Sequence, residues 1–130
     1  MNKEGYNEGM SFHITTRQRE PGITVIEIGG RITLGRESGQ IETVVMKALN
    51  DGSLRLVFDL SKLAYIDSTG MGTIAYCIGK ISQKGARAAI AGTTEVVFDV
   101  FKLMRLDSVI RFFPDVASAC GGLTATGAST

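Results

Sequence analysis

Apolar positions along the chain follow two spacings that alternate. In three stretches they recur every three or four residues, which is typical of a helix that rests one face on a sheet. These stretches are 41–49, 71–81 and 97–104. Between them lie short runs rich in apolar and β-branched residues, typical of strands. These runs are 23–28, 54–60 and 86–91.

Weaker signals complete the pattern: strands over 12–18 and 109–113, and a short last helix over 114–120. Pro21-Gly22 predicts a tight turn, so the first two strands should pair antiparallel. The later strands are separated by helices, and such crossover connections favour parallel pairing. Right-handed crossover connections place the helices mainly together on one side of the sheet. We therefore expect an α/β fold, a small mixed and mainly parallel β-sheet with helices packed mostly on one side.

A chain of 130 residues is the size of one domain. Residues 1–10 are polar and aperiodic, and we expect a flexible N-terminal extension there. The segment 122–130 is rich in small residues, and we expect a flexible C-terminal tail. The predicted domain is 11–121.

Charge and composition narrow the function classes. The net charge is +1, from 14 basic and 13 acidic residues, which gives no long-range attraction to nucleic acid or anionic lipid. Apolar runs are shorter than the ~20 residues that span a bilayer, and residues 1–10 lack the apolar core of a signal peptide. We expect a cytoplasmic protein without membrane insertion.

Candidate chemistry for an enzyme is sparse. His13 is the only histidine, which disfavours a histidine-based triad or a multi-histidine metal site. The phosphate-binding loop of nucleotide enzymes is missing from the sequence. Cys77 and Cys120 have no metal-type spacing and are expected to be buried free thiols. We therefore expect no catalytic residue, no metal and no cofactor.

The run Asp67-Ser68-Thr69-Gly70-Met71-Gly72 lies where a strand-like stretch gives way to a helical one. Ser68 is placed to cap that helix, because its oxygen can accept a hydrogen bond from an N–H of the first turn. An exposed hydroxyl at this junction can also receive a phosphoryl group. Gly70 and Gly72 carry no side chain, so another backbone can approach closely.

Four features in chain order make the sequence resemble the STAS domain family, and within it the anti-sigma factor antagonists. They are Gly30-Arg31-Ile32, the run 54–60, the segment 66–72, and Gly85 with the apolar stretch after it. The resemblance covers roughly residues 12–120. The second and third features together are specific, whereas the first and last alone are weak.

The resemblance implies a bacterial regulator of transcription. In the family, the serine after the Asp of this loop is phosphorylated by a serine kinase that is also an anti-sigma factor. The unphosphorylated form sequesters that kinase and frees the sigma factor, and a protein phosphatase resets the system. Matched residue by residue, Asp67 and Ser68 take the loop positions, with Ser68 as the phosphorylation site. A monomer or weak dimer is expected.

The predicted partner-binding surface joins two strand-to-helix loops, which lie side by side in folds of this kind. Its expected residues are Arg31, Thr33, Asp67, Ser68, Thr69, Gly70 and Met71, and Arg36 is expected to line the same surface. The sequence departs from the family pattern at Thr33, where an Asp that helps partner contact or phosphorylation is common. We expect Thr33 to cap the first helix without supplying that charge.

Two other readings remain open. The first is a STAS module without a phosphorylation cycle, acting as a scaffold or as the soluble subunit of a lipid-transport complex. It differs from the switch in whether Ser68 accepts phosphate. The second is a small phosphate-binding or hydrolytic domain, which is disfavoured because the sequence offers a hydroxyl but no base.

Overall fold

The computed structural model describes residues 11–33 and 37–124, and within them a six-stranded sheet with four helices. The expected extension at 1–10 lies outside the described residues, as does 125–130. The strands and helices, in chain order, are β1 (His13–Arg19), β2 (Ile23–Ile32), α2 (Ser38–Asn50), β3 (Arg55–Asp59), β4 (Leu63–Ile66), α3 (Ser68–Gln83), β5 (Arg87–Ala91), α4 (Glu95–Leu103), β6 (Phe112–Phe113) and α5 (Val116–Thr124).

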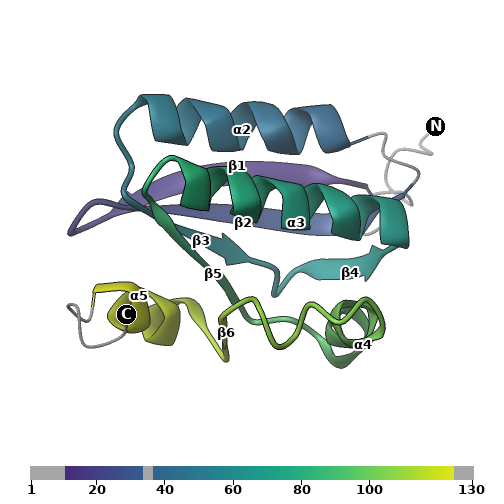
Figure 1. Ribbon diagram of the computed structural model, residues 1–130. Coiled ribbons are helices and arrows are strands. Elements are labelled where there is room, and N and C mark those ends of the chain that lie inside the picture. The colour runs from purple at the N-terminus through teal and green to yellow at the C-terminus, as the bar shows by residue number, and fades with distance from the viewer. Residues whose placement is uncertain (1–10, 34–36, 125–130) are drawn as a thin grey trace.

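The sheet is mixed, as expected (Figure 1). Its order is β1-β2-β3-β5-β6, and β4 pairs with β2 beside that path. β1 pairs antiparallel with β2 across the turn at Pro21-Gly22, and the remaining pairs are parallel. The expected α/β class with a mainly parallel sheet is therefore confirmed.

β2 is longer than the sequence suggested. The apolar run predicted a strand over 23–28, but β2 continues to Ile32. Gly30 has a φ of 88°, and the register with β4 shifts between Gly30 and Arg31. A Cβ at Gly30 would collide with the carbonyl of Ser11. This irregularity lets one strand pair first with β3 and then with β4, a four-residue strand that the sequence analysis missed.

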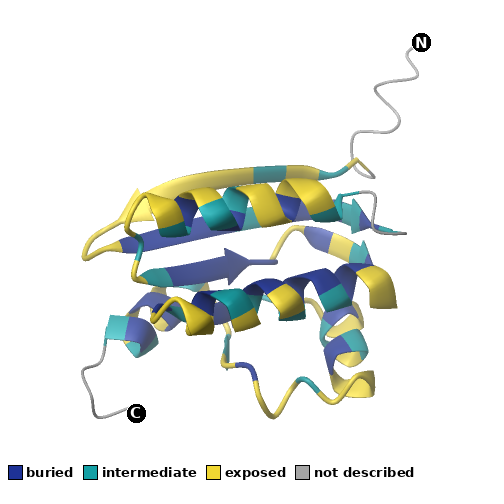
Figure 2. Ribbon diagram, turned by 45° about the horizontal axis from the view of Figure 1, so that its top comes forward, coloured by how far each residue is buried: buried dark blue, intermediate teal, exposed yellow. Residues whose placement is uncertain are grey.

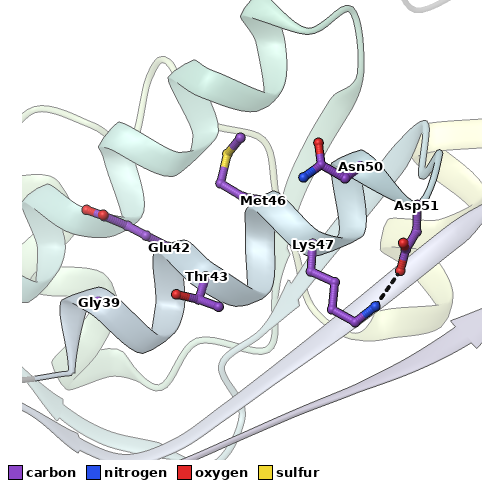
Figure 3. Close-up of a pocket in the computed structure, with 7 residues that line it drawn as sticks. All are labelled: Gly39, Glu42, Thr43, Met46, Lys47, Asn50 and Asp51. Carbon is purple, nitrogen blue, oxygen red and sulfur yellow. Dashed lines mark hydrogen bonds and ion pairs between the residues drawn. The ribbon is translucent and has the colours of Figure 1, made fainter.

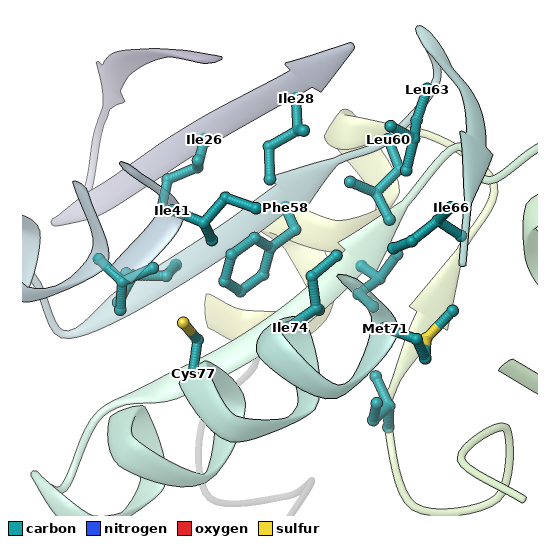
Figure 4. Close-up of a cluster of buried hydrophobic side chains, with 14 of the residues drawn as sticks. Ile26, Ile28, Ile41, Phe58, Leu60, Leu63, Ile66, Met71, Ile74 and Cys77 are labelled. Atoms are coloured by element: carbon teal, nitrogen blue, oxygen red, sulfur yellow. The ribbon is translucent and has the colours of Figure 1, made fainter. Parts of the chain in front are cut away.

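Two apolar clusters lie on opposite faces of the sheet. The larger one packs α2, α3 and α4 against the face that carries Ile26, Leu56 and Phe58 (Figure 4). The smaller packs α5 against the face that carries Val25 and Val57. Helices thus lie mostly on one side of the sheet. In Figure 2 the central strands are largely coloured as buried, and buried and exposed residues alternate along the helices.

Both cysteines are buried and free, as expected. Burial, helped by the charge of Glu42, raises the pKa of the Cys77 thiol to about 11. The thiolate is the reactive form of cysteine, so Cys77 is unreactive near neutral pH.

The C-terminal end differs from expectation. The strand expected over 109–113 contains only Phe112 and Phe113. α5 begins after Asp115, whose carboxylate accepts a hydrogen bond from Ser118 N at 2.7 Å. The helix then passes through Gly121-Gly122 and buries Leu123 completely. The structure therefore continues beyond the expected domain boundary at 121, since residues 122–124 are helical rather than part of a tail.

Candidate functional site

Two strand-to-helix junctions meet at one end of the sheet. β2 and β4 run parallel, with Ile32 opposite Ile66, and both of these side chains are buried. Asp67 N donates to Ile32 O at 3.2 Å. Thr33 and Asp67, which follow the two strands, therefore lie at neighbouring positions, as the sequence predicted for these two loops.

The start of α3 is capped by Asp67. Its Oδ1 accepts a hydrogen bond from Gly70 N at 2.8 Å, and its backbone is extended. Ser68 is the first residue of the helix, so the expectation that Ser68 caps it is wrong by one residue. The carboxylate also places negative charge at the positive end of the helix dipole, which is favourable.

Exposure divides the Asp67–Gly72 segment. Ser68 and Thr69 are exposed, Asp67 is half-buried, and Gly70 and Met71 are buried. Met71 was expected to contact a partner, but its side chain is fully buried and points into the core (Figure 4). Met71 therefore anchors the segment in the core, and its side chain has no exposed surface that a partner could contact.

The two glycines have different roles. Neither has a positive φ. A Cβ at Gly70 would collide with Ile32 Cγ2, whereas a Cβ at Gly72 would meet nothing within 4 Å. Gly70 is therefore closely packed within the fold, against the side chain of an isoleucine of β2, and the expected approach of another backbone stays a prediction. At Gly72 the expectation of close approach is not met within the fold.

Glu37, which the sequence analysis missed, organises the other junction. It is the N-cap residue of α2, so the expectation that Thr33 caps this helix is wrong. The Glu37 carboxylate accepts a hydrogen bond from Thr33 N at 3.2 Å. A carboxylate thus lies beside the position where the family pattern commonly has Asp. Arg36 lies outside the described residues.

A hydroxyl pair ties the two helices together near their starts. Ser38 Oγ lies 2.6 Å from Thr73 Oγ1, and Thr73 Oγ1 donates to Thr69 O at 3.3 Å. A hydroxyl carries one proton, so Ser38 is the donor to Thr73. The first residue of α2 is thereby fixed against the first turns of α3, a contact that no local pattern in the sequence signals.

Arg31 lies at the same end of the sheet but on the other face. Ile32 and Ile66 point into the core under α3, so Arg31 and Tyr65 point the opposite way. The Arg31 guanidinium carbon lies 4.4 Å from the centre of the Tyr65 ring. The structure brings Thr33, Asp67, Ser68 and Thr69 together. It places Arg31 on the opposite face of the sheet.

A hollow along the outer side of α2 lies away from these residues (Figure 3). Its seven lining residues come from α2 and the residue that follows it, and they include an exposed Lys47–Asp51 ion pair of 2.9 Å. A surface made by one helix cannot enclose a ligand, so we assign it no site. Among residues 11–33 and 37–124, no group of three or more His, Cys, Asp or Glu side chains is arranged to hold a metal ion. In this same part of the chain no helix is both long and apolar enough to cross a membrane.

Known proteins are similar to this chain in sequence and in fold. The chain is 28% identical over 102 residues to the anti-sigma-F factor antagonist RsfB of Mycobacterium tuberculosis, covering 78% of this chain and 82% of RsfB. The crystal structure of an anti-sigma factor antagonist from Mycobacterium paratuberculosis has a TM-score of 0.77 at 18% identity, covering 87% of this chain and 94% of that one.

A second protein of similar fold has been solved in two states. SpoIIAA of Bacillus in its phosphorylated form has a TM-score of 0.63 at 18% identity, covering 85% of this chain and 97% of that one. Its unphosphorylated form has a TM-score of 0.67 at 19% identity, covering 85% and 93%. These likenesses show the fold. The family model of the STAS domain matches residues 15–119, from β1 to the middle of α5, and the chain therefore belongs to the STAS domain family.

Proposed function

We propose that this chain is an anti-sigma factor antagonist that is switched by phosphorylation of Ser68. In its unphosphorylated form it binds and sequesters a serine-kinase anti-sigma factor, and a protein phosphatase restores that form. The role is a protein-binding switch rather than an enzyme. The proposal rests chiefly on one observation: Ser68 is exposed at the first turn of α3, directly after the capping Asp67.

The geometry at Ser68 supports a phosphate acceptor. The capping hydrogen bond at this helix start is made by Asp67, so modification of the Ser68 hydroxyl leaves the cap in place. A phosphate adds about −1.5 to −2 charge, which the positive end of a helix dipole tolerates. A phosphorylated chain is therefore expected to keep its fold.

The same phosphate would weaken partner binding. Asp67 is already negative, so docking would remove water from two neighbouring negative groups. A surface that packs closely on Ser68 and Thr69 would also meet the bulk of the phosphate. The switch can thus act at the interface without a change in the domain itself.

The comparisons support this choice among the open readings. RsfB, to which the chain is similar over most of its length, is named as an antagonist of an anti-sigma factor. SpoIIAA, which has the same fold, is described in both phosphorylated and unphosphorylated forms. The carboxylate of Glu37, bound to Thr33 N, supplies a negative group where Thr33 itself has none.

The test is phosphorylation by the serine-kinase anti-sigma factor encoded nearest to this gene. Incubation with ATP should add one phosphate to the intact chain, and fragment mass spectra should place it on Ser68. The Ser68→Ala variant should stay unmodified, whereas the control Thr69→Ala should be modified like the unaltered protein. Phosphate on Thr69, or an unchanged mass gain in Ser68→Ala, would contradict the assignment.

Binding then tests the switch. In titration calorimetry against the same kinase, Ser68→Ala should bind about as well as the unaltered chain, Ser68→Glu more weakly, and the phosphorylated chain most weakly. Glu carries less charge than phosphate, which sets the order. Equal affinity of all forms would favour a STAS scaffold without a phosphorylation cycle.

A further inference from the structure

A groove lies between α2 and α3, one turn beyond the hydroxyl pair that joins their starts. The two helices lie side by side over one face of the sheet (Figure 1). They leave a cavity of about 240 Å³. Each helix supplies three of the lining residues: Glu42, Val45 and Met46 from α2, and Tyr76, Cys77 and Lys80 from α3. Unlike the hollow on the outer side of α2, this groove therefore has two walls.

The floor of the groove is apolar. Val45 and Cys77 are 1% and 2% exposed and belong to the larger of the two apolar clusters. Met46 is half-buried, and its flexible thioether side chain can adapt to the shape of a bound group. Tyr76 is 54% exposed, so its ring is accessible beside the floor. This lining favours a ligand with an apolar body.

Two opposite charges lie on the two walls. Glu42 is exposed. Burial raises the pKa of the Cys77 thiol and the charge of Glu42 adds to this effect, so the carboxylate lies within electrostatic reach of the floor. Lys80 Nζ lies 5.7 Å from the centre of the Tyr76 ring. Within residues 11–33 and 37–124 neither Glu42 nor Lys80 forms an ion pair, which leaves both charges available to a ligand.

The two charges select the class of ligand. A simple anion would be attracted by Lys80 and repelled by Glu42, and a simple cation would meet the reverse. A zwitterion gains from both groups. An apolar α-amino acid combines an ammonium, a carboxylate and an apolar side chain, and it is therefore complementary to both walls and to the floor.

We propose that this groove binds an apolar α-amino acid. Its ammonium pairs with Glu42, its carboxylate pairs with Lys80, and its side chain packs on Val45 and Cys77. The volume of the groove is just below the ~300–1,000 Å³ typical of small-molecule sites, so the ligand is small. The site is separate from the phosphorylation switch and does not depend on it.

The test uses the full chain, labelled with ¹⁵N, and three probes that share one apolar body. L-Leucine is the zwitterion, 3-methylbutylamine lacks its carboxylate, and 4-methylpentanoate lacks its ammonium. Titration with leucine should give saturable shifts of the amide signals of Val45, Met46, Tyr76 and Cys77. Each analogue should bind about tenfold more weakly or worse, because it loses a charged hydrogen bond. Binding of either analogue as tight as that of leucine, shifts centred elsewhere in the chain, or no saturable shift would overturn the proposal.

Matched variants test the two charges. Glu42→Gln should weaken leucine binding about tenfold or more without weakening the binding of 4-methylpentanoate. Lys80→Gln should weaken leucine binding to a similar extent without weakening the binding of 3-methylbutylamine. The controls Glu95→Gln and Lys102→Gln remove the same charges from α4 and should leave all three affinities unchanged. Equal weakening by the groove variants and the controls would contradict a built site.

Discussion

Gly70 and Gly72 share the first turns of α3 but meet different surroundings. The Gly70 backbone lies against Ile32 and Ile66, which are fixed by pairing of β2 with β4. Gly72 faces open space. The shared motif thus contains one glycine required by packing and one that the fold itself does not require.

Alanine substitution should separate the two roles. At Gly70 the added methyl overpacks Ile32, at about 1–3 kcal/mol, and the helix propensity gain of ~1 kcal/mol only partly offsets this. Gly72→Ala gains the propensity without the clash, so it should be neutral or stabilising by up to ~1 kcal/mol. Urea denaturation of both variants measures this. A Gly70→Ala chain as stable as Gly72→Ala would show that the contact with Ile32 is easily relieved.

At the scale of elements, the candidate site depends on how α2 and α3 are joined. Each helix start is tied to the end of β2, through Glu37 to Thr33 N and through Asp67 N to Ile32 O. The Ser38–Thr73 hydroxyl pair links the helices directly. Three short contacts therefore position Ser68 and Thr69 relative to the start of α2.

A double-mutant cycle tests the hydroxyl pair. Ser38→Ala should lower the free energy of unfolding by about 0.5–1.5 kcal/mol, because it removes one side of a hydrogen bond. Thr73→Val should cost more, because it also removes the hydrogen bond to Thr69 O. The double variant should be little worse than the poorer single variant, since the second change has no bond left to break. Denaturant midpoints of the four proteins measure the coupling. Strictly additive losses would mean that the two hydroxyls contribute independently.

At the scale of the whole molecule, α5 is the helix that stands apart. It packs on the sheet face opposite α2 and α3 (Figure 1). Its last turn holds Leu123, which is fully buried, and accepts hydrogen bonds from Arg55 and Arg87. α5 therefore covers the second face of the sheet.

Truncation should locate the end of the domain. A chain ending at Thr124 keeps all of α5 and should unfold at the same denaturant concentration as the full chain. A chain ending at Gly121 loses Leu123, whose burial is worth about 1.5–3 kcal/mol, together with the arginine contacts. Its midpoint should be clearly lower, and the full-length variant Leu123→Ala should reproduce much of the loss. Equal midpoints for both truncations would place the boundary at 121 after all.

The sequence by itself determined the features that depend on neighbours along the chain. The spacing of Ile41, Val45 and Ala48 predicted α2, and the same spacing over 71–81 predicted α3. The apolar run 86–91 predicted β5. The turn at Pro21-Gly22 fixed the antiparallel pairing of β1 and β2. The segment 66–72, with the strand before it, was enough to indicate the STAS family. The assignment of phosphorylation to Ser68 stays a prediction.

Only the tertiary structure decided the features that depend on distant residues. β4 is too short to show a period, and it exists because β2 continues past Gly30 to pair with it. Asp67 and Ser68 are both good capping residues, and the backbone of the strand-to-helix junction decided for Asp67. Met71 and Arg31 were expected on one surface with Ser68. In the structure Met71 is buried in the core, and Arg31 points to the opposite face of the sheet because side chains alternate along a strand. Leu123 continues a helix beyond two glycines because the sheet face below it offers an apolar surface, and no local pattern contains that information.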